Sequence, residues 1–149
     1  MSTLATASGE TVTSGMVLAA GLGLRMRPIT ERIPKPLVMV AGRCLLDRAL
    51  DHYADAGLTR AIVNTHYLAD QIAAHVAARS QPAIALSHEQ ALLETGGGVL
   101  NALPLLGTGP FFVTNSDALW LNGPIPALTR LARAWNGAIM DALLLLSVI

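Results

Sequence analysis

The stretch MVLAAGLGLRMRPITERIPKPLVMV, residues 16–40, decides how this chain folds. Its first five residues are apolar and form a run of the length expected for a buried central strand. The glycine turn that follows, residues 21–23, lets the backbone bend tightly and approach a ligand without an intervening Cβ. Arg25 and Lys35 come soon after the turn. A strand, a glycine turn and nearby cations together predict a phosphate-binding site.

The turn differs from the two commonest glycine-rich nucleotide motifs. A dinucleotide-binding turn has the pattern G-x-G-x-x-G, but Met26 stands at the third glycine position, and the Gly-Lys pair of a P-loop is absent. The chain instead has A-A-G-x-G-x-R-M-x-P over residues 19–28, followed by P-K-P-L over residues 34–37. These motifs resemble the signature of the sugar-1-phosphate nucleotidylyltransferases, which join a nucleoside triphosphate to a sugar 1-phosphate and release pyrophosphate.

Composition bounds the class of protein. A length of 149 residues predicts one domain with a sizeable core, which we place at residues 14–149 behind a disordered tail, residues 1–13. The net charge of zero gives no reason to expect nucleic acid or an anionic membrane as a partner. No membrane span or targeting signal is evident, so we expect a cytoplasmic protein. The single cysteine, Cys44, excludes an internal disulfide and predicts a buried or capping thiol.

Strand and helix patterns alternate along the chain. Strands or extended segments are expected at 16–20, 37–40, 60–64, 83–86, 111–114 and 141–149, and helices at 44–56, 68–79, 96–103 (ended by Pro104) and 125–135. Nearly all-apolar strands alternating with helices predict a mostly parallel sheet covered on both faces, a three-layer αβα, Rossmann-like α/β fold. The resemblance implies the nucleotide-diphospho-sugar transferase type of this fold, incomplete at its C-terminus because members of the family continue further.

The resemblance also implies roles for individual residues. Arg25 and Lys35 are the candidate catalytic residues, because fixed cations stabilise the negative charge that develops on a transferring phosphoryl group. Asp117 follows the predicted strand at 111–114 and resembles the metal-binding aspartate of the family, which predicts Mg²⁺ as the cofactor. Asn64, His66 and Asn115 are the candidates for contact with the sugar phosphate.

A second motif, LETGGG at residues 93–98, resembles the branch of the family that activates N-acetylmuramate 1-phosphate or mannose 1-phosphate. Its glycines permit a backbone edge to approach a base and a ribose. The expected nucleotide-binding residues are Leu18, Ala19, Ala20, Gly21, Gly23, Arg25, Glu89, Glu94, Thr95 and Gly96.

These features predict Mg²⁺-dependent nucleotidylyl transfer, with UTP or GTP favoured as the nucleotide and the sugar left open. Two alternatives stay open: a non-catalytic nucleotide-binding or regulatory module of the same fold, and a Rossmann-type oxidoreductase. Met26, and Asn64 where an acidic residue is expected, disfavour the oxidoreductase. Self-association is also predicted, because a strand at residues 142–149 would present an apolar edge.

Overall fold

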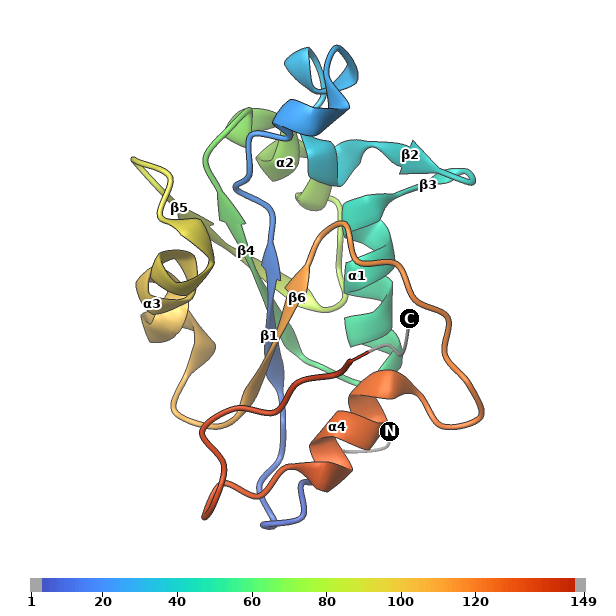
Figure 1. Cartoon of the computed structure of the whole chain (residues 1–149), viewed down its shortest axis with the longest axis vertical. Coiled ribbons are helices and arrows are strands. Elements are labelled where there is room, and N and C mark those ends of the chain that lie inside the picture. The colour runs from blue at the N-terminus through green and yellow to red at the C-terminus, as the bar shows by residue number, and fades with distance from the viewer. Residues whose placement is uncertain (1–3, 147–149) are drawn as a thin grey trace.

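A computed structural model describes residues 4–146 of the chain (Figure 1). The central sheet has four strands, all parallel, in the order β5-β4-β1-β6. They are β1 (Ser14–Leu18), β4 (Arg60–Thr65), β5 (Ala83–His88) and β6 (Phe111–Asn115). A separate antiparallel pair, β2 (Met39–Val40) with β3 (Arg43–Cys44), forms a small hairpin. The mostly parallel sheet predicted from the sequence is therefore confirmed.

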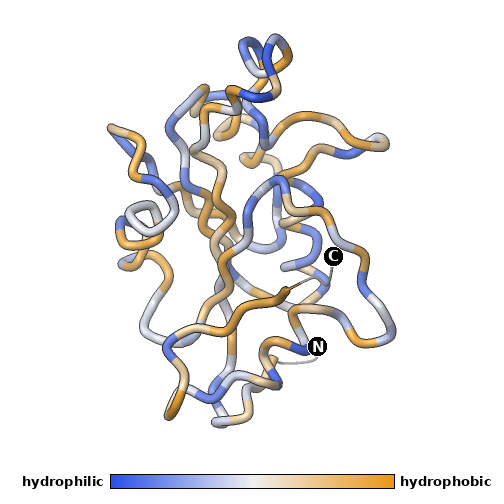
Figure 2. Tube along the Cα trace, in the orientation of Figure 1, coloured by the Kyte–Doolittle hydropathy of each residue, from blue (hydrophilic) through white to orange (hydrophobic). Residues whose placement is uncertain are grey.

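Helices cover both faces of the sheet. One face carries α1 (Leu45–Asp55), α2 (Ala69–Val76) and α4 (Ala127–Ala134), which pack with Val17 and Val63 in one core cluster. The other face carries α3 (Glu94–Leu106), which packs with Met16 and Ile62 in a second cluster. Alternate residues of a strand point to opposite faces, so β1 and β4 each supply both clusters. Figure 2 shows the apolar residues along these central strands. The fold has the three predicted layers.

The strand order reverses at β1, and this positions the site. Helices α1 and α2 connect β1 to β4 and β5 on one side, whereas α3 leads back across β1 to β6 on the other side. Ligands of such sheets bind beyond the carboxyl ends of the strands, at the point of reversal. Between β1 and β2 the chain forms three short 3₁₀ helices, η1 (Leu24–Met26), η2 (Ile29–Glu31) and η3 (Lys35–Leu37).

Tyr53 of α1 ties the two strands beside the reversal point together. Its side chain is fully buried, and its hydroxyl donates to the carbonyl of Met16 and hydrogen-bonds Thr114 Oγ1, each at 2.8 Å. Burial raises the pKa of the Tyr53 hydroxyl well above its ordinary value. A Cβ on Gly15 would lie 2.7 Å from the tyrosine ring, so glycine is required beside it. This contact holds β1, β6 and α1 in register.

The predicted disordered tail is wrong for residues 4–13. Leu4 and Val12 are buried in the core cluster that includes α4, and Ala5 pairs with Thr11 in an antiparallel bridge. The segment is polar on average, but these two apolar side chains are enough to anchor it. Residues 1–3 lie outside the described part of the chain.

The predicted strand at 141–149 is wrong for residues 141–146, which form no regular structure. Leu144 and Leu146 are 75% and 81% exposed, and Figure 2 shows this apolar segment near the C-terminus. An apolar sequence becomes a strand only where its backbone groups find a neighbouring strand, and none is described beside it. Residues 147–149 lie outside the described part. The prediction of self-association rested on an exposed strand edge, and residues 141–146 form no such strand.

Several element boundaries also differ from the sequence analysis by one to three residues; β1, for example, spans Ser14–Leu18, and α2 ends at Val76. Helix α3 begins at Glu94 and continues through Pro104 to Leu106, because Leu105 and Leu106 pack onto the sheet beyond the proline. The extended segment expected at 37–40 begins as η3 and becomes extended only over Met39–Val40. Within residues 4–146, no helix combines the length and the apolar character needed to cross a membrane.

Candidate active site

A cavity of about 210 Å³ lies beyond the carboxyl ends of the parallel strands, where the strand order reverses. Its lining residues are Leu18, Ala19, Ala20, Gly21, Lys35, Pro36, Asn64, Glu89, Leu92, Glu94, Thr95, Asn115, Ser116 and Asp117. Sequence analysis named all of these except Pro36, Leu92 and Ser116. Pro36 belongs to the P-K-P-L motif and Ser116 adjoins Asp117, whereas Leu92 carries no signal in the sequence. Four other predicted residues, Gly23, Arg25, His66 and Gly96, do not line this cavity.

The two glycines of the turn have different tasks. A Cβ on Gly21 would meet no atom within 4 Å, so the absence of a side chain keeps open the space that this residue lines. Gly23 has a φ of 64°, and a Cβ there would lie 2.9 Å from the Thr30 side chain. The buried Thr30 hydroxyl in turn donates to the carbonyl of Gly23 at 2.8 Å. Gly21 leaves room for a ligand, and Gly23 allows the turn itself to form.

Gly21→Val should weaken nucleotide binding by roughly tenfold or more, because the valine methyl groups would enter the cavity. A loss of about 1.4 kcal/mol of binding free energy is enough to raise the Kd tenfold. Gly123→Val is the matched control, since Gly123 is exposed and a Cβ there also meets open space. Calorimetric titration with a nucleoside triphosphate measures both variants. A folded Gly21→Val protein with unchanged affinity would show that the turn is not part of the site.

Lys35 and Asp117 meet at the cavity. The lysine is presented by η3, the aspartate follows β6, and the two side chains form an ion pair across 82 residues of sequence. The hydrogen bond from Lys35 holds the pKa of the Asp117 carboxyl below its usual range, and Arg25 adds a smaller Coulombic effect. Arg25 thus acts on the site although it does not line the cavity. The predicted phosphate cation and the predicted metal ligand are partners in this structure.

This ion pair makes a small, pH-dependent contribution to stability. Because the pKa of Asp117 is lowered by folding, the contribution is present above the unfolded-state pKa and is lost as the pH falls through the folded-state pKa. The aspartate side chain is 42% exposed, so solvent screens the pair. Both charges therefore remain available to a charged ligand.

Asn64 and Glu89 both line the cavity, and they also form a buried hydrogen-bonded relay. Asn64 Oδ1 accepts from the amide of Ala19 at 2.7 Å, and Asn64 Nδ2 donates to Glu89 Oε1 at 2.7 Å. Glu89 Oε2 accepts from the amide of Leu93 at 3.0 Å. A Cβ on Gly98 would lie 2.8 Å from Glu89 Oε1, so that glycine makes room for the relay. The relay connects the end of β1 to the start of α3.

The relay gives a structural role to Asn64, predicted to contact the sugar phosphate, and to Glu89, predicted to contact the nucleotide. Both ends of the Asn64 amide and both carboxylate oxygens of Glu89 are engaged inside the protein. His66 hydrogen-bonds the carbonyl of Glu89 at 2.9 Å through Nδ1 and so supports the same loop. Glu94 and Thr95, at the exposed start of α3, line the cavity directly. Their amide-rich helix terminus favours an anionic ligand.

The family model described as nucleotidyl transferase matches residues 14–146. The chain belongs to the nucleotidyl transferase family. The resemblance inferred from its motifs is confirmed, and the residues matched include every element of the sheet. Relatives in this family are sugar-1-phosphate nucleotidyltransferases, which supports the predicted reaction class.

Curated relatives give the same result. N-acetylmuramate alpha-1-phosphate uridylyltransferase of Caulobacter vibrioides is 48% identical over 137 residues, covering 89% of this chain and 57% of that protein. The protein of the same name from Neisseria meningitidis serogroup B is 47% identical over 107 residues, covering 70% and 46%. Mannose-1-phosphate guanyltransferase beta-B of Xenopus laevis is 33% identical over 109 residues, covering 70% and 30%. The chain spans about half the length of the first two relatives.

Solved structures confirm the fold class. HddC from Yersinia pseudotuberculosis, complexed with GMP-PN, superposes with a TM-score of 0.63 at 31% identity and covers 71% of this chain and 48% of that one. A UDP-glucose pyrophosphorylase complexed with UDP-glucose gives a TM-score of 0.73 at 20% identity, covering 81% and 52%. The second likeness is one of fold alone.

Proposed function

We propose that this chain binds a nucleoside triphosphate and transfers its nucleotidyl group to a sugar 1-phosphate. The observation that carries the proposal is the meeting of the glycine-turn backbone, Lys35 and Asp117 at the cavity where the strand order reverses. The Caulobacter and Neisseria relatives, both uridylyltransferases acting on N-acetylmuramate 1-phosphate by name, favour UTP and that sugar phosphate as the substrates. GTP with mannose 1-phosphate is the next pair to test.

The reaction needs charge and position more than a nucleophilic side chain. A phosphate oxygen of the sugar 1-phosphate forms a bond to the α-phosphorus, the bond from that phosphorus to the bridging oxygen breaks, and pyrophosphate leaves. The substrate supplies the nucleophile, so the protein contributes orientation and cations. Lys35 would exchange its contact with Asp117 for the triphosphate, while the backbone of Ala19 to Gly21 lies against the nucleotide.

Asp117 is the residue that would hold Mg²⁺. Its carboxylate lines the cavity and offers the hard oxygen ligands that this ion requires. Its ion-pair partner among residues 4–146 is Lys35, a cation that phosphate can take over. Mg²⁺, when bound, neutralises phosphate charge. The residues present fit this cofactor, and the dependence of the reaction on it is part of the proposal.

A non-catalytic nucleotide-binding module is the second candidate. It is favoured by the Lys35–Asp117 pair, because the ammonium that would stabilise the transition state contacts a carboxylate in this structure. Such a module would bind a triphosphate through the glycine turn and the start of α3 without driving transfer.

One experiment separates these functions. The chain is incubated with Mg²⁺, each of UTP, GTP, CTP and dTTP, and either N-acetylmuramate 1-phosphate or mannose 1-phosphate, and both pyrophosphate and nucleotide sugar are measured. We expect both products with UTP and N-acetylmuramate 1-phosphate, and neither in the presence of EDTA. Calorimetry with nucleotide alone runs in parallel. Binding without products would support the module, and the absence of both would contradict either function.

A further inference from the structure

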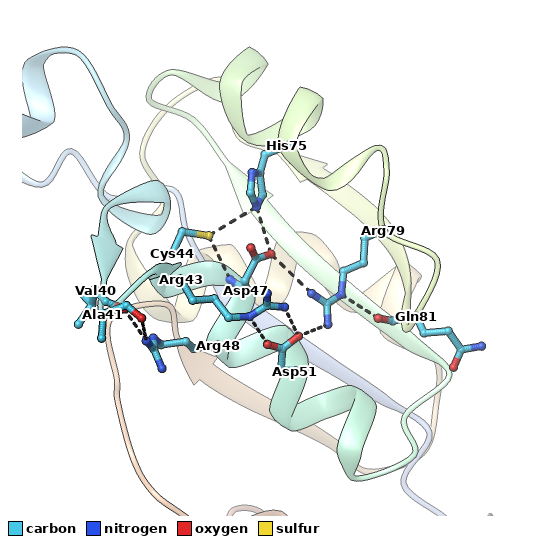
Figure 3. A network of polar contacts seen from close by, with 10 residues as sticks. All are labelled: Val40, Ala41, Arg43, Cys44, Asp47, Arg48, Asp51, His75, Arg79 and Gln81. Carbon is cyan, nitrogen blue, oxygen red and sulfur yellow. Dashed lines mark hydrogen bonds and ion pairs between the residues drawn. The ribbon is translucent and has the colours of Figure 1, made fainter.

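A second polar cluster lies away from the cavity, between α1, α2 and the β2–β3 hairpin (Figure 3). Cys44 ends β3 and caps the N-terminus of α1, Asp47 lies in the first turn of α1, and His75 lies in the last turn of α2. The sulfur of Cys44 is 3.5 Å from His75 Nε2, which is 3.1 Å from Asp47 Oδ1. All three ligand atoms lie within 4.8 Å of one another.

We propose that Cys44, Asp47 and His75 bind a zinc-type transition-metal ion. A tetrahedral zinc, with a Zn–S bond of about 2.3 Å and Zn–N and Zn–O bonds of about 2.0–2.1 Å, separates sulfur from nitrogen by about 3.6 Å and nitrogen from oxygen by about 3.3 Å. The two separations in the structure are within a few tenths of an ångström of these values. The third pair, the Cys44 sulfur and Asp47 Oδ1, lies within 4.8 Å, and an ion bound to all three ligands would hold these two atoms about 3.6 Å apart.

The ligand set selects the class of metal. Thiolate, imidazole and carboxylate together suit Zn²⁺ and its neighbours in the first transition row, whereas Mg²⁺ and Ca²⁺ require oxygen ligands alone. His75 and Asp47 have side chains that are 36% and 21% exposed, so water reaches the fourth coordination position. This site would differ from the Mg²⁺ site proposed at Asp117 in both place and chemistry.

The surrounding charges leave Asp47 available as a ligand. Arg79 approaches Asp47 Oδ1 at 3.5 Å but is anchored elsewhere, because its Nη2 donates to Asp51 at 2.7 Å and its Nε donates to the carbonyl of Gln81 at 2.7 Å. Burial raises the pKa of Asp51, but the hydrogen bonds from Arg43 and Arg79 outweigh this effect and lower it overall. The positive charges of the two arginines equal the negative charges of Asp47 and Asp51. The additional negative charge that a metal ion would neutralise is therefore that of the Cys44 thiolate.

Cys44 determines how binding depends on protons. The residue is 2% exposed, and burial raises the pKa of the thiol to about 11. The titratable and charged groups around it are Asp47 from α1, His75 and Arg79 from α2 and its C-terminal turn, and Arg43 from β3. The thiol is therefore protonated near neutral pH, and a metal that binds the sulfur must displace its proton.

Titration of the metal-free chain with Co²⁺ tests the proposal. Thiolate ligation gives a charge-transfer band in the near ultraviolet, and four-coordinate geometry gives intense visible bands. We expect one Co²⁺ per chain, displaced by one Zn²⁺. Cys44→Ser should abolish the charge-transfer band and weaken Zn²⁺ binding by roughly 100-fold or more, because the thiolate is the strongest of the three ligands. Calorimetry at pH 8 in buffers of different ionisation enthalpy should show about one fewer proton released by Cys44→Ser.

The variants are chosen so that the fold survives. Serine keeps an acceptor at the N-cap of α1, where Cys44 Sγ now accepts from the amide of Asp47 at 3.4 Å. His75→Gln removes a second ligand, and its matched control is His52→Gln on α1, which removes a histidine outside the cluster. His75→Gln should lose Co²⁺ affinity and His52→Gln should retain it. Absence of the charge-transfer band in the wild-type chain, or equal binding by wild type and Cys44→Ser, would overturn the proposal and leave the cluster a contact between helices.

Discussion

Lys35→Ala should lower the kcat of pyrophosphate release by roughly 10²–10³-fold, the usual cost of removing one preorganised charge contact to a transition state. Lys35 is the only lysine in the sequence. Among the described residues that line the cavity, it is the only cation. Its contact with Asp117 shows that the ammonium already lies in the cavity before any phosphate arrives. Steady-state kinetics with the proposed substrates measure the loss.

The control for this prediction is Arg32→Ala, which removes an exposed cation at the end of η2 that does not line the cavity. A second readout follows Asp117 by NMR. Without Lys35, the carboxyl pKa should rise toward its ordinary value, leaving the weaker influence of Arg25. If kcat changes by only a few-fold while this pKa rises as expected, Lys35 is a partner of Asp117 and not a catalytic residue.

Asn64→Ala should lower the free energy of unfolding by about 2–6 kcal/mol, because two buried groups each lose a partner at about 1–3 kcal/mol apiece. These groups are the amide of Ala19 and Oε1 of Glu89. The end of β1 and the start of α3 should also lose their connection, so nucleotide affinity should fall as well. Urea denaturation measures the first effect and calorimetric titration the second.

Asn101→Ala is the matched control for Asn64→Ala. Asn101 is exposed, and its side chain makes one hydrogen bond, to Ser87 Oγ at 3.0 Å. Its loss should cost about 0.5–1.5 kcal/mol, the net value of an ordinary hydrogen bond. Equal destabilisation by the two substitutions would show that the buried relay adds nothing beyond a surface contact.

The layered fold could be predicted because its causes are local. Apolar runs and helical periodicity set the order of elements, and the glycine turn after β1 identifies the ligand edge of the sheet. The ends of the chain could not be predicted in this way. Leu4 and Val12 pack against α4, which is distant in the sequence, and residues 141–146 lack the neighbouring strand that their composition would need.

Site residues that belong to contiguous motifs could also be predicted, whereas those that depend on contacts between distant segments could not. Backbone positions at Ala19 to Gly21, together with Lys35, Glu94 and Asp117, follow from contiguous motifs and were placed at the cavity. The relay through Asn64 and Glu89 depends on how β4 and β5 are registered, with Thr65 opposite His88, and no local pattern reveals that register. Thr30, whose hydroxyl donates to the carbonyl of Gly23, was also missed, because a threonine seven residues after the turn matches no part of the motifs.

The placement of β6 beside β1 has a consequence for the order of folding. Strand β6 reaches its position only after β4, β5 and α3 have been made, and the ion pair at the cavity closes a loop of 82 residues. Contacts so distant in sequence form late, since the entropy of closing the loop is lost before the contact stabilises it. On the ribosome, the half of the pocket that carries Lys35 emerges well before the half that carries Asp117. A nucleotide can therefore contact both halves of the pocket only after β6 has docked beside β1.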